Sequence, residues 1–294
     1  MKIGVDLGGT KVKAGVEKNG SIVQQNTIML QQKDSLSATL GQLINLIRPL
    51  THYSVKSIGI GVPSVVDTKR GIVYNVANIP SWEKVALKDI LEEEFNLPVF
   101  VNNDVNCFTL GEHLYGVAQN FDSVVGMTIG TGLGSGIIID NQLYTGSNCG
   151  AGEIGLLPYR DHDFEYYAGS NFFEVMHGIS AVEASREALS GNQVAIGLWE
   201  EFGLHVGAAI KAVLYIYDPE AIVLGGSIAK AYSLFKGSMF KSLDDFAYPE
   251  SLKRLKIFQS QNDDIALLGA AELVSQDTKS HFIDALHQPV NAPK

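Results

Sequence analysis

The sequence predicts a layered α/β protein composed of two similar domains around a cleft. Strand-like and helix-like stretches alternate along most of the 294 residues, which is typical of helices packed on sheets. A glycine-containing stretch near the start, residues 3–20, also recurs as residues 125–142. A chain of this length exceeds the usual size of one hydrophobic core, so two domains are the natural expectation.

The first half opens with a predicted β-hairpin. Ile3, Val5 and Leu7 alternate with smaller or polar residues, as in a strand, until the glycines at residues 8–9 break the pattern. The alternation resumes after residue 11. Later patterns predict a helix within residues 36–50 that stops at Pro49, a buried strand at 55–62, a helix at 87–95, a short strand at 99–101 and a helix at 104–115.

The second half repeats this hairpin. Residues 125–142 can be laid over residues 3–20 at a constant offset of 122 without a gap, which aligns Gly126 with Gly4 and one glycine turn with the other. We interpret the repeat as a duplicated domain, and a chance likeness of two short apolar hairpins is the alternative. Further patterns predict helices at 182–190, 197–217 and 266–274 and a strand at 221–224.

These elements place the predicted domain boundaries. We expect an N-terminal domain at residues 1–115, completed by a helix near 266–275, and a C-terminal domain at residues 116–265. Residues 276–294 are polar and contain Pro289 and Pro293, so we expect a loosely held tail there.

The composition narrows the classes of partner. A net charge of −10, from 22 basic and 32 acidic residues, argues against a nucleic-acid or anionic-membrane surface. The two cysteines, Cys107 and Cys149, are too few for a disulfide framework, which favours a reduced, cytoplasmic setting. Ile3 already belongs to the first strand, so no signal peptide is expected, and no apolar run is long enough to suggest a membrane span.

The glycine turns are candidate phosphate sites. A turn of small residues exposes several backbone N–H groups in one concavity, which suits anionic oxygens. Thr10 and Lys11 add a hydroxyl and a positive charge beside the first turn, and residues 130–132 form the second. Asp6 leads into the first turn, where a carboxylate would repel phosphate unless a cation such as Mg²⁺ lay between them.

Several motifs, in this order and spacing, resemble the sugar kinases of the ROK family, which have the actin-like ATPase (ribonuclease H-like) fold. The resemblance covers residues 3 to about 271. The motifs are DLGGTK at Asp6–Lys11, GIGVP at Gly59–Pro63, NND at Asn102–Asp104, IGTGLGSG at Ile129–Gly136, GAGEIG at Gly150–Gly155 and VLGGSIA at Val223–Ala229.

The resemblance implies transfer of the γ-phosphoryl group of ATP, with Mg²⁺, to a hexose hydroxyl. It makes Asp104 the catalytic base, because phosphoryl transfer needs a group that accepts the hydroxyl proton. Asp104 follows a predicted strand and opens a helix, so a role as helix N-cap alone is the alternative. The residues implied to hold phosphate and ATP are Asp6, Gly8, Gly9, Thr10, Lys11, Thr131, Gly132, Gly225 and Gly226, with Gly225 and Gly226 at the adenosine.

The resemblance also implies four sugar-binding residues, which are Asn78, Asn103, Glu153 and Glu174. Plainer roles exist for some of them. Glu153 could be a solvated loop acid and Asn78 a turn former. The glycines assigned to adenosine could serve packing instead.

One segment departs from the commonest family pattern, which follows the glutamate motif with a histidine and a C-x-C-G-x-x-G-C cluster that bind structural zinc. Leu156 stands at the histidine position and residues 152–174 contain no cysteine, so we expect no zinc. Five aromatic residues occur instead, and we expect them to pack a small core, with a sugar-stacking platform as the alternative. They are Phe164, Tyr166, Tyr167, Phe172 and Phe173.

The sequence therefore predicts an ATP-dependent hexose kinase, with glucose as the favoured acceptor. N-acetylmannosamine, N-acetylglucosamine and fructose are alternative acceptors. Two other classes stay open, a sugar sensor without turnover and a transcriptional repressor, because part of the family carries a DNA-binding domain. This chain begins its first motif at residue 3 and is acidic, so neither nucleic acid nor membrane is an expected partner. A homodimer is expected from the resemblance alone.

Overall fold

The computed structural model describes residues 1–276 and divides into two compact units. Unit 1 comprises Met1–Gly111 together with the chain from Asp264 onward, and unit 2 comprises Glu112–Asp263. These divisions fall a few residues before the boundaries expected at 115/116 and 265/266. All but the first residue of the tail predicted at 276–294 lies outside the described residues.

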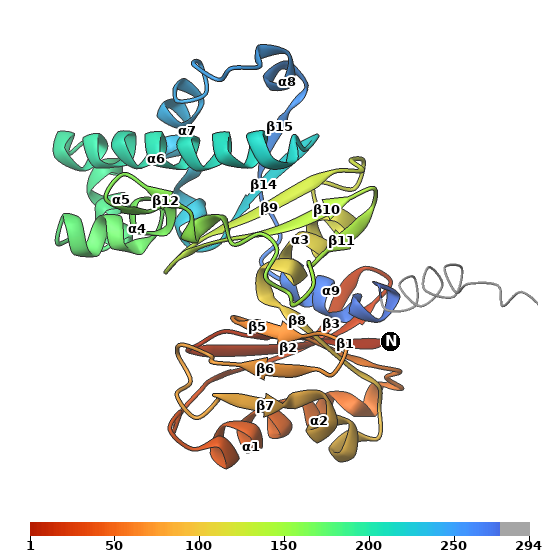
Figure 1. Ribbon diagram of the computed structural model, residues 1–294. Helices are drawn as coiled ribbons and strands as arrows, with labels where there is room; N and C mark the ends of the chain where they lie inside the picture. Colours follow the sequence, from red (N-terminus) through yellow and green to blue (C-terminus); the bar gives the residue numbers. More distant parts are fainter. Residues whose placement is uncertain (277–294) are drawn as a thin grey trace, which may run out of the picture. The chain divides into compact units, whose positions relative to one another are not determined.

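Unit 1 is built on a five-stranded mixed sheet, in the order β3-β2-β1-β4-β8 (Figure 1). The predicted hairpin is present as β1 (Lys2–Leu7) and β2 (Lys11–Lys18), and β3 (Ser21–Met29) extends it on the other side of β2. The strands β4 (Ile58–Val62) and β8 (Val99–Asn103) run parallel to β1. The carboxyl ends of these three strands therefore share one edge of the sheet, where open α/β sheets place their ligands.

The helices of unit 1 agree closely with the sequence patterns. They are α1 (Leu36–Ile47), α2 (Leu87–Phe95), α3 (Asp104–Tyr115) and α9 (Ile265–Ala271). The α1 helix gives way to a 3₁₀ turn at Arg48–Tyr53, because Pro49 has no N–H to continue the ladder. A small sheet of β5 (Val65–Asp67), β6 (Ile72–Tyr74) and β7 (Lys84–Ala86) completes the unit.

The α9 helix packs backbone to backbone against the sheet and against α3. A Cβ added at Gly4 would lie 1.9 Å from the carbonyl oxygen of Leu267, and one added at Gly59 would lie 1.7 Å from that of Ala270. On the helix itself, a Cβ at Gly269 would lie 1.8 Å from a carbonyl oxygen of α3. No side chain fits at these positions, so glycine is what allows α9 to complete the core of unit 1.

Unit 2 repeats the sheet of unit 1, in the order β11-β10-β9-β14-β15. Its strands are β9 (Val124–Ile129), β10 (Leu133–Ile139), β11 (Gln142–Tyr144), β14 (Ala221–Gly225) and β15 (Lys256–Gln259). As in unit 1, the first strand pairs antiparallel with the second and parallel with the fourth, and two parallel strands end the sheet. The duplicated topology confirms the predicted α/β class.

The gapless overlay of the two hairpins holds for the first strand only. The two starting strands are offset by 122, but Leu7 lies opposite Val12 whereas Ile129 lies opposite Leu133. Four residues therefore separate the last paired residues of the first hairpin, Leu7 and Val12, and three separate those of the second. The second strands differ by one residue in register, because turn length sets register in a hairpin.

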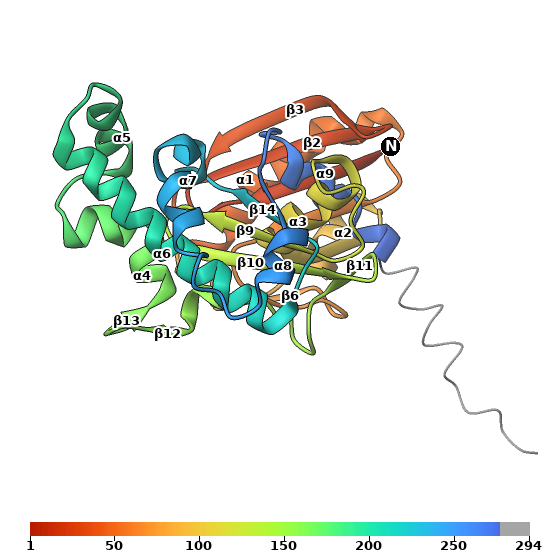
Figure 2. The ribbon, with the colours of Figure 1, turned by 90° about the horizontal axis from the view of Figure 1, so that it is seen from above.

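The core of unit 2 lies between its sheet and the long helix α6 (Gln193–Tyr217), which runs along one face of the sheet (Figures 1 and 2). Aliphatic side chains form most of this core, and they pack with several aromatic ones, among them Trp199, Phe202 and Phe235, all fully buried. The other helices are α4 (Phe164–Ala168), α5 (Ala181–Leu189), α7 (Tyr232–Lys241) and α8 (Pro249–Arg254). Within the described residues, no helix combines the length and apolarity needed to cross a membrane.

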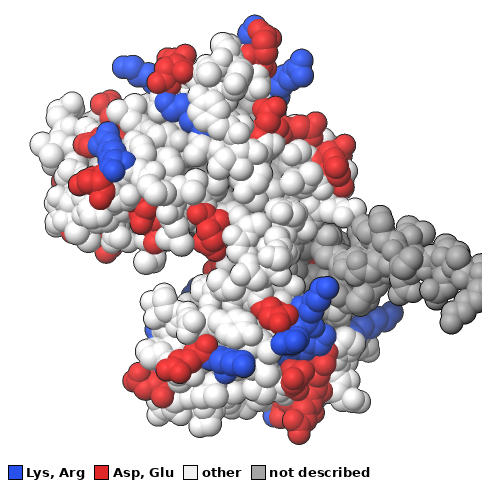
Figure 3. Space-filling view, viewed as in Figure 1, with Lys and Arg blue, Asp and Glu red and all other residues white. Residues whose placement is uncertain are grey.

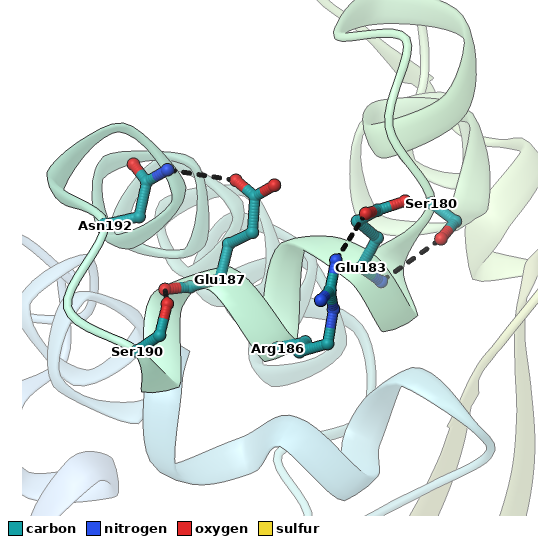
Figure 4. A network of polar contacts seen from close by, with 6 residues as sticks. All are labelled: Ser180, Glu183, Arg186, Glu187, Ser190 and Asn192. Atoms are coloured by element: carbon teal, nitrogen blue, oxygen red, sulfur yellow. Dashed lines mark hydrogen bonds and ion pairs between the residues drawn. The ribbon is translucent and has the colours of Figure 1, made fainter.

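Polar side chains set the limits of α5 and α6 (Figure 4). The Ser180 hydroxyl accepts from the Glu183 N–H at 3.1 Å and starts α5 one residue before the predicted 182. The Asn192 side chain accepts from the N–H groups of the first turn of α6 and donates to Glu187 at 3.0 Å. This cap starts α6 at residue 193 rather than 197, because an N-cap satisfies N–H groups that hydrophobic periodicity does not register.

We expect Gly59→Ala to lower the free energy of unfolding by about 2 kcal/mol or more, because α9 must shift to admit the methyl group. Gly41→Ala is the matched control in the same unit. Its Cβ would meet nothing within 4 Å, and alanine in a helix interior is worth up to about 1 kcal/mol over glycine. Urea unfolding of both variants measures the difference. Equal stability of the two would contradict the close packing of α9.

Candidate active site in two units

In unit 1, the candidate residues lie at the carboxyl ends of three parallel strands. Asp6 on β1 stands opposite Gly61 on β4, which in turn stands opposite Asn102 on β8. Asp6 and Asn102 are thus two strand spacings apart, or about 10 Å. Gly61 leaves room for the start of α3, since a Cβ there would lie 3.1 Å from the Cα atom of Asp104.

The first glycine turn leaves two consecutive backbone donors free. The Gly8 N–H donates to the Lys11 carbonyl at 3.0 Å, and the Leu30 N–H donates to the Thr10 carbonyl at 2.8 Å. The N–H groups of Gly9 and Thr10 find no acceptor among the described residues. A pair of free N–H groups in a tight turn suits an anionic oxygen.

Asn78 lies directly against this turn. A Cβ added at Gly9 would lie 2.3 Å from the Cβ of Asn78, so glycine is needed for their contact. The structure therefore brings a residue predicted to bind sugar together with one predicted to bind phosphate. Trp82, four residues further on, is buried and donates to the Thr39 hydroxyl at 2.8 Å, so it serves the core.

Asp6 lies in an environment that suits a carboxylate with a cation beside it. Its side chain is half-buried and no described group hydrogen-bonds it. Burial raises the pKa of Asp6, while the charges of Lys13 and Lys11 lower it. A divalent cation beside Asp6 would compensate for the burial, so the residue fits the metal role that the sequence predicts.

In the NND motif, Asn103 and Asp104 make different contacts at the start of α3. The Asn103 side-chain oxygen accepts from the N–H groups of Val105 at 2.9 Å and Asn106 at 3.3 Å, which makes it the cap of α3. Its amide group donates to the Ser64 carbonyl at 3.4 Å. The Asp104 carboxylate contacts the N–H of Val105 at 2.8 Å, but the capping role considered for it is filled by Asn103.

The second glycine turn, in unit 2, also leaves two donors free. The Gly130 N–H donates to the Gly132 carbonyl at 2.9 Å. Ser170 holds the other side of the turn, donating its N–H to the Gly130 carbonyl at 3.0 Å and its hydroxyl to the Thr131 carbonyl at 3.1 Å. The N–H groups of Thr131 and Gly132 find no acceptor in the part of the chain that the structure describes.

The glycines predicted at the adenosine follow β14. Gly225 ends that strand opposite Thr128, and Gly226 is exposed with a φ of +88°. A Cβ at Gly226 would lie 2.4 Å from the Ile129 carbonyl oxygen. Packing against β9 thus accounts for Gly226, and its contact with adenosine stays a prediction.

Glu165, a carboxylate that the sequence analysis does not single out, lies close enough to Glu153 to affect its pKa. Burial of its carboxylate and the charge of Glu165 both raise the pKa of Glu153. Glu165, on α4, also accepts from the Leu133 N–H at 3.1 Å, at the end of the second turn. Glu174, the other acid that the resemblance implied at the sugar, is exposed on a π-helical turn at Phe172–Met176. A sequence signal for Glu165 did exist: Asp163, two residues earlier, is an N-cap residue, and it starts the helix α4 that places Glu165 beside the second turn.

The aromatic residues expected in place of a zinc site belong mainly to the core. Phe164, Phe172 and Phe173 join the core of unit 2, and Tyr167 is also buried. Tyr166 is half-buried and stacks on the His162 ring at 3.9 Å between centroids. Residues 1–276 contain no group of three His, Cys, Asp or Glu side chains arranged to hold a metal ion.

A hairpin of β12 (Pro158–Tyr159) and β13 (His162–Asp163) fastens this loop to α6. The Tyr159 hydroxyl lies 3.2 Å from Nδ1 of His205, a fully buried residue on α6. Tyr167 donates to the Asp161 carboxylate in the turn. The Arg160 guanidinium lies over the rings of Tyr159 and Tyr167, at 5.6 Å and 5.3 Å.

The chain belongs to the ROK family, because the model of that family matches residues 2–277. Its solved relatives have the actin-like ATPase fold. The ROK family glucokinase from Streptomyces griseus, solved in complex with glucose and AMPPNP, is 28% identical with a TM-score of 0.79, covering 92% of this chain and 98% of that one.

Both kinases and repressors occur among the relatives of this chain. Glucokinase of Thermotoga maritima is 26% identical over 309 residues, covering 93% of this chain and 97% of that protein. The xylose repressor of Bacillus spizizenii is 25% identical over 312 residues, covering 96% of this chain and 79% of the repressor. The relatives of this chain thus include both glucokinases and xylose repressors.

We expect acid to destabilise unit 2 through His205. Burial is the main cause that lowers its pKa to about 4, the Arg160 charge lowers it further, and Glu201, 3.7 Å from Nε2, opposes them. The unfolded chain binds the proton near pH 6.5, so stability is full above that pH. Up to about 3 kcal/mol is lost as the pH falls towards 4.

Urea unfolding between pH 4 and 6.5 measures this loss. His205→Phe, which keeps a ring in the cluster, should flatten the pH dependence. His52→Gln, at an exposed histidine of unit 1, should leave the dependence unchanged. A wild-type profile no steeper than that of His205→Phe would contradict the assignment.

Proposed function

We propose that this chain is an ATP-dependent sugar kinase with glucose as its favoured acceptor. The observation that carries the proposal is the pair of glycine turns, each with two consecutive free backbone N–H groups, at Gly9–Thr10 and at Thr131–Gly132. Each of these turns, one in each unit, would accept phosphate oxygens of the nucleotide at its free N–H groups. Likeness to a glucokinase solved with glucose and an ATP analogue supports the choice of ligands.

In this proposal each candidate residue has a defined task. Asp6 would hold Mg²⁺, which supplies neutralisation of phosphate charge when bound. Asp104 would accept the proton of the attacking sugar hydroxyl, a role that is compatible with Asn103 as the cap of α3. Asn78, Asn103 and the acids Glu153 and Glu174 would bind sugar hydroxyls.

A repressor or a sensor without turnover is the alternative function, and the xylose repressors among the relatives favour considering it. Lysines and arginines do not form one basic patch on the face drawn in Figure 3, where the described basic residues lie among acidic ones. Several are paired across the surface of unit 2, for example Lys230 with Asp263 at 2.7 Å and Lys211 with Asp245 at 2.6 Å. N-acetylmannosamine, N-acetylglucosamine and fructose are the alternative acceptors for a kinase.

The test is ADP release from Mg-ATP over a panel of hexoses and N-acetylhexosamines. We expect sugar-dependent release that Asp104→Asn lowers by about 100-fold or more, with ATP affinity little changed, because the variant removes the proton acceptor alone. Asp89→Asn, in the first turn of α2 and exposed, is the matched control and should keep full activity.

Each other outcome has a distinct meaning. Sugar binding without ADP release in the wild-type protein would favour the sensor. Specific binding to DNA would favour the repressor. Full activity of Asp104→Asn would leave the kinase standing and refute the assignment of its base.

A further inference from the structure

The α4 helix and the residues after it hold the second glycine turn from two sides. Glu165 accepts from the Leu133 N–H at 3.1 Å, where the turn enters β10. Ser170 donates to the carbonyl groups of Gly130 and Thr131 at the opposite side of the turn. These contacts leave the Thr131 and Gly132 N–H groups as the free donors between two held ends.

The turn and Glu165 are fitted closely to one another. A Cβ added at Gly132 would lie 2.1 Å from Oε2 of Glu165, so any side chain there would displace the carboxylate. The loop that bears Glu153 meets the same point, since a Cβ at Gly155 would lie 2.1 Å from the Leu133 carbonyl oxygen and 3.4 Å from Cβ of Glu165. Glu165 therefore contacts both the second glycine turn and the loop that bears Glu153.

A carboxylate at an anion-binding turn needs an explanation, because its charge opposes a bound phosphate. Leu133 follows Gly132 directly, and its N–H would otherwise be a third donor in the row. By accepting from that N–H, Glu165 ends the row after Gly132 and holds the strand in register. The geometry is that of a support for the turn.

We propose that Glu165 is a positioning residue that fixes the second glycine turn for a nucleotide phosphate and couples it to Glu153. This inference rests on the proposed function for its ligand, and it concerns a residue that contacts the turn rather than the reacting atoms. Loss of the carboxylate frees the Leu133 N–H and loosens the two donors at Thr131 and Gly132. Neutralising it without shortening keeps the contact and removes only the charge felt by Glu153.

Two variants separate these effects. Glu165→Ala removes the acceptor, so we expect faster hydrogen exchange at the Leu133 amide and affinity for AMPPNP reduced by about tenfold. Glu165→Gln keeps an acceptor oxygen, so it should restore the slow exchange of Leu133 and bring AMPPNP affinity within about threefold of wild type. In Glu165→Gln the pKa of Glu153 should fall, because the neighbouring charge that raises it is gone.

Hydrogen exchange by NMR, calorimetric binding of AMPPNP and carboxyl titration of Glu153 are the three measurements, and none needs turnover. Glu200→Ala, an exposed acid on α6, is the control and should change none of them. In Glu165→Gln, Leu133 exchange and AMPPNP affinity should recover while the pKa of Glu153 changes. A purely structural role of the α4 helix would not produce this combination.

The proposal is overturned if Glu165→Ala leaves both Leu133 exchange and AMPPNP affinity unchanged, or if glutamine fails to rescue them. Its failure differs from failure of the kinase. If the wild-type protein binds AMPPNP but transfers no phosphate, the predicted changes in exchange and affinity still support the role of Glu165. If the wild-type protein binds no AMPPNP, both the nucleotide site and this role in it are refuted.

Discussion

The close approach of α9 to the sheet is the constraint on which unit 1 depends. The helix comes from the far end of the chain, yet its backbone touches β1, β4 and α3 at glycines that admit no side chain. At the start of α9, a Cβ on Gly111 would lie 2.1 Å from the Ile265 carbonyl oxygen. The chain therefore leaves unit 1 through α3 and returns to it at α9 in direct contact. The strand ends that bear Asp6 and Asn102 belong to the same sheet.

Repetition of one sheet topology gives the protein two candidate anion-binding turns of different construction. The first has four residues between its last paired residues and closes with the hydrogen bond from Gly8 to Lys11, whereas the second has three and is held by side chains of Glu165 and Ser170. Both end with two free N–H groups, so different local hydrogen bonding produces the same kind of donor pair. Two of the candidate acids, Asp6 and Glu153, have a raised pKa mainly because of burial.

Side chains of residues 156–174 hold this loop against the rest of unit 2. The β12–β13 hairpin contacts α6 through Tyr159 and His205, and the phenylalanines of the segment join the core. Apolar burial and stacked rings thus hold α4, and with it Glu165, against the second turn. The loop and the turn form one packed structure within unit 2.

Much of the fold and part of the site could be predicted from local patterns. Hydrophobic periodicity located α2 and α3 within the residues where they occur, because burial of one face repeats at the period of the element. Helix starts that depend on side-chain caps, such as Asn192, were misplaced for the reason that periodicity carries no hydrogen-bond information. Glycine turns followed by polar residues indicated both candidate anion sites, since a run of small residues interrupts the strand pattern there.

The sequence by itself determined the α/β class, the duplicated hairpins and the family motifs, since these rest on residue order. Tertiary structure alone decided that Asn103 caps α3, that Asn78 lies on Gly9, and that Glu165 contacts Leu133. The second hairpin likewise has a turn one residue shorter than a gapless overlay implied. Such facts depend on which distant backbone groups meet, and the distance between two residues along a chain does not specify their contact in space.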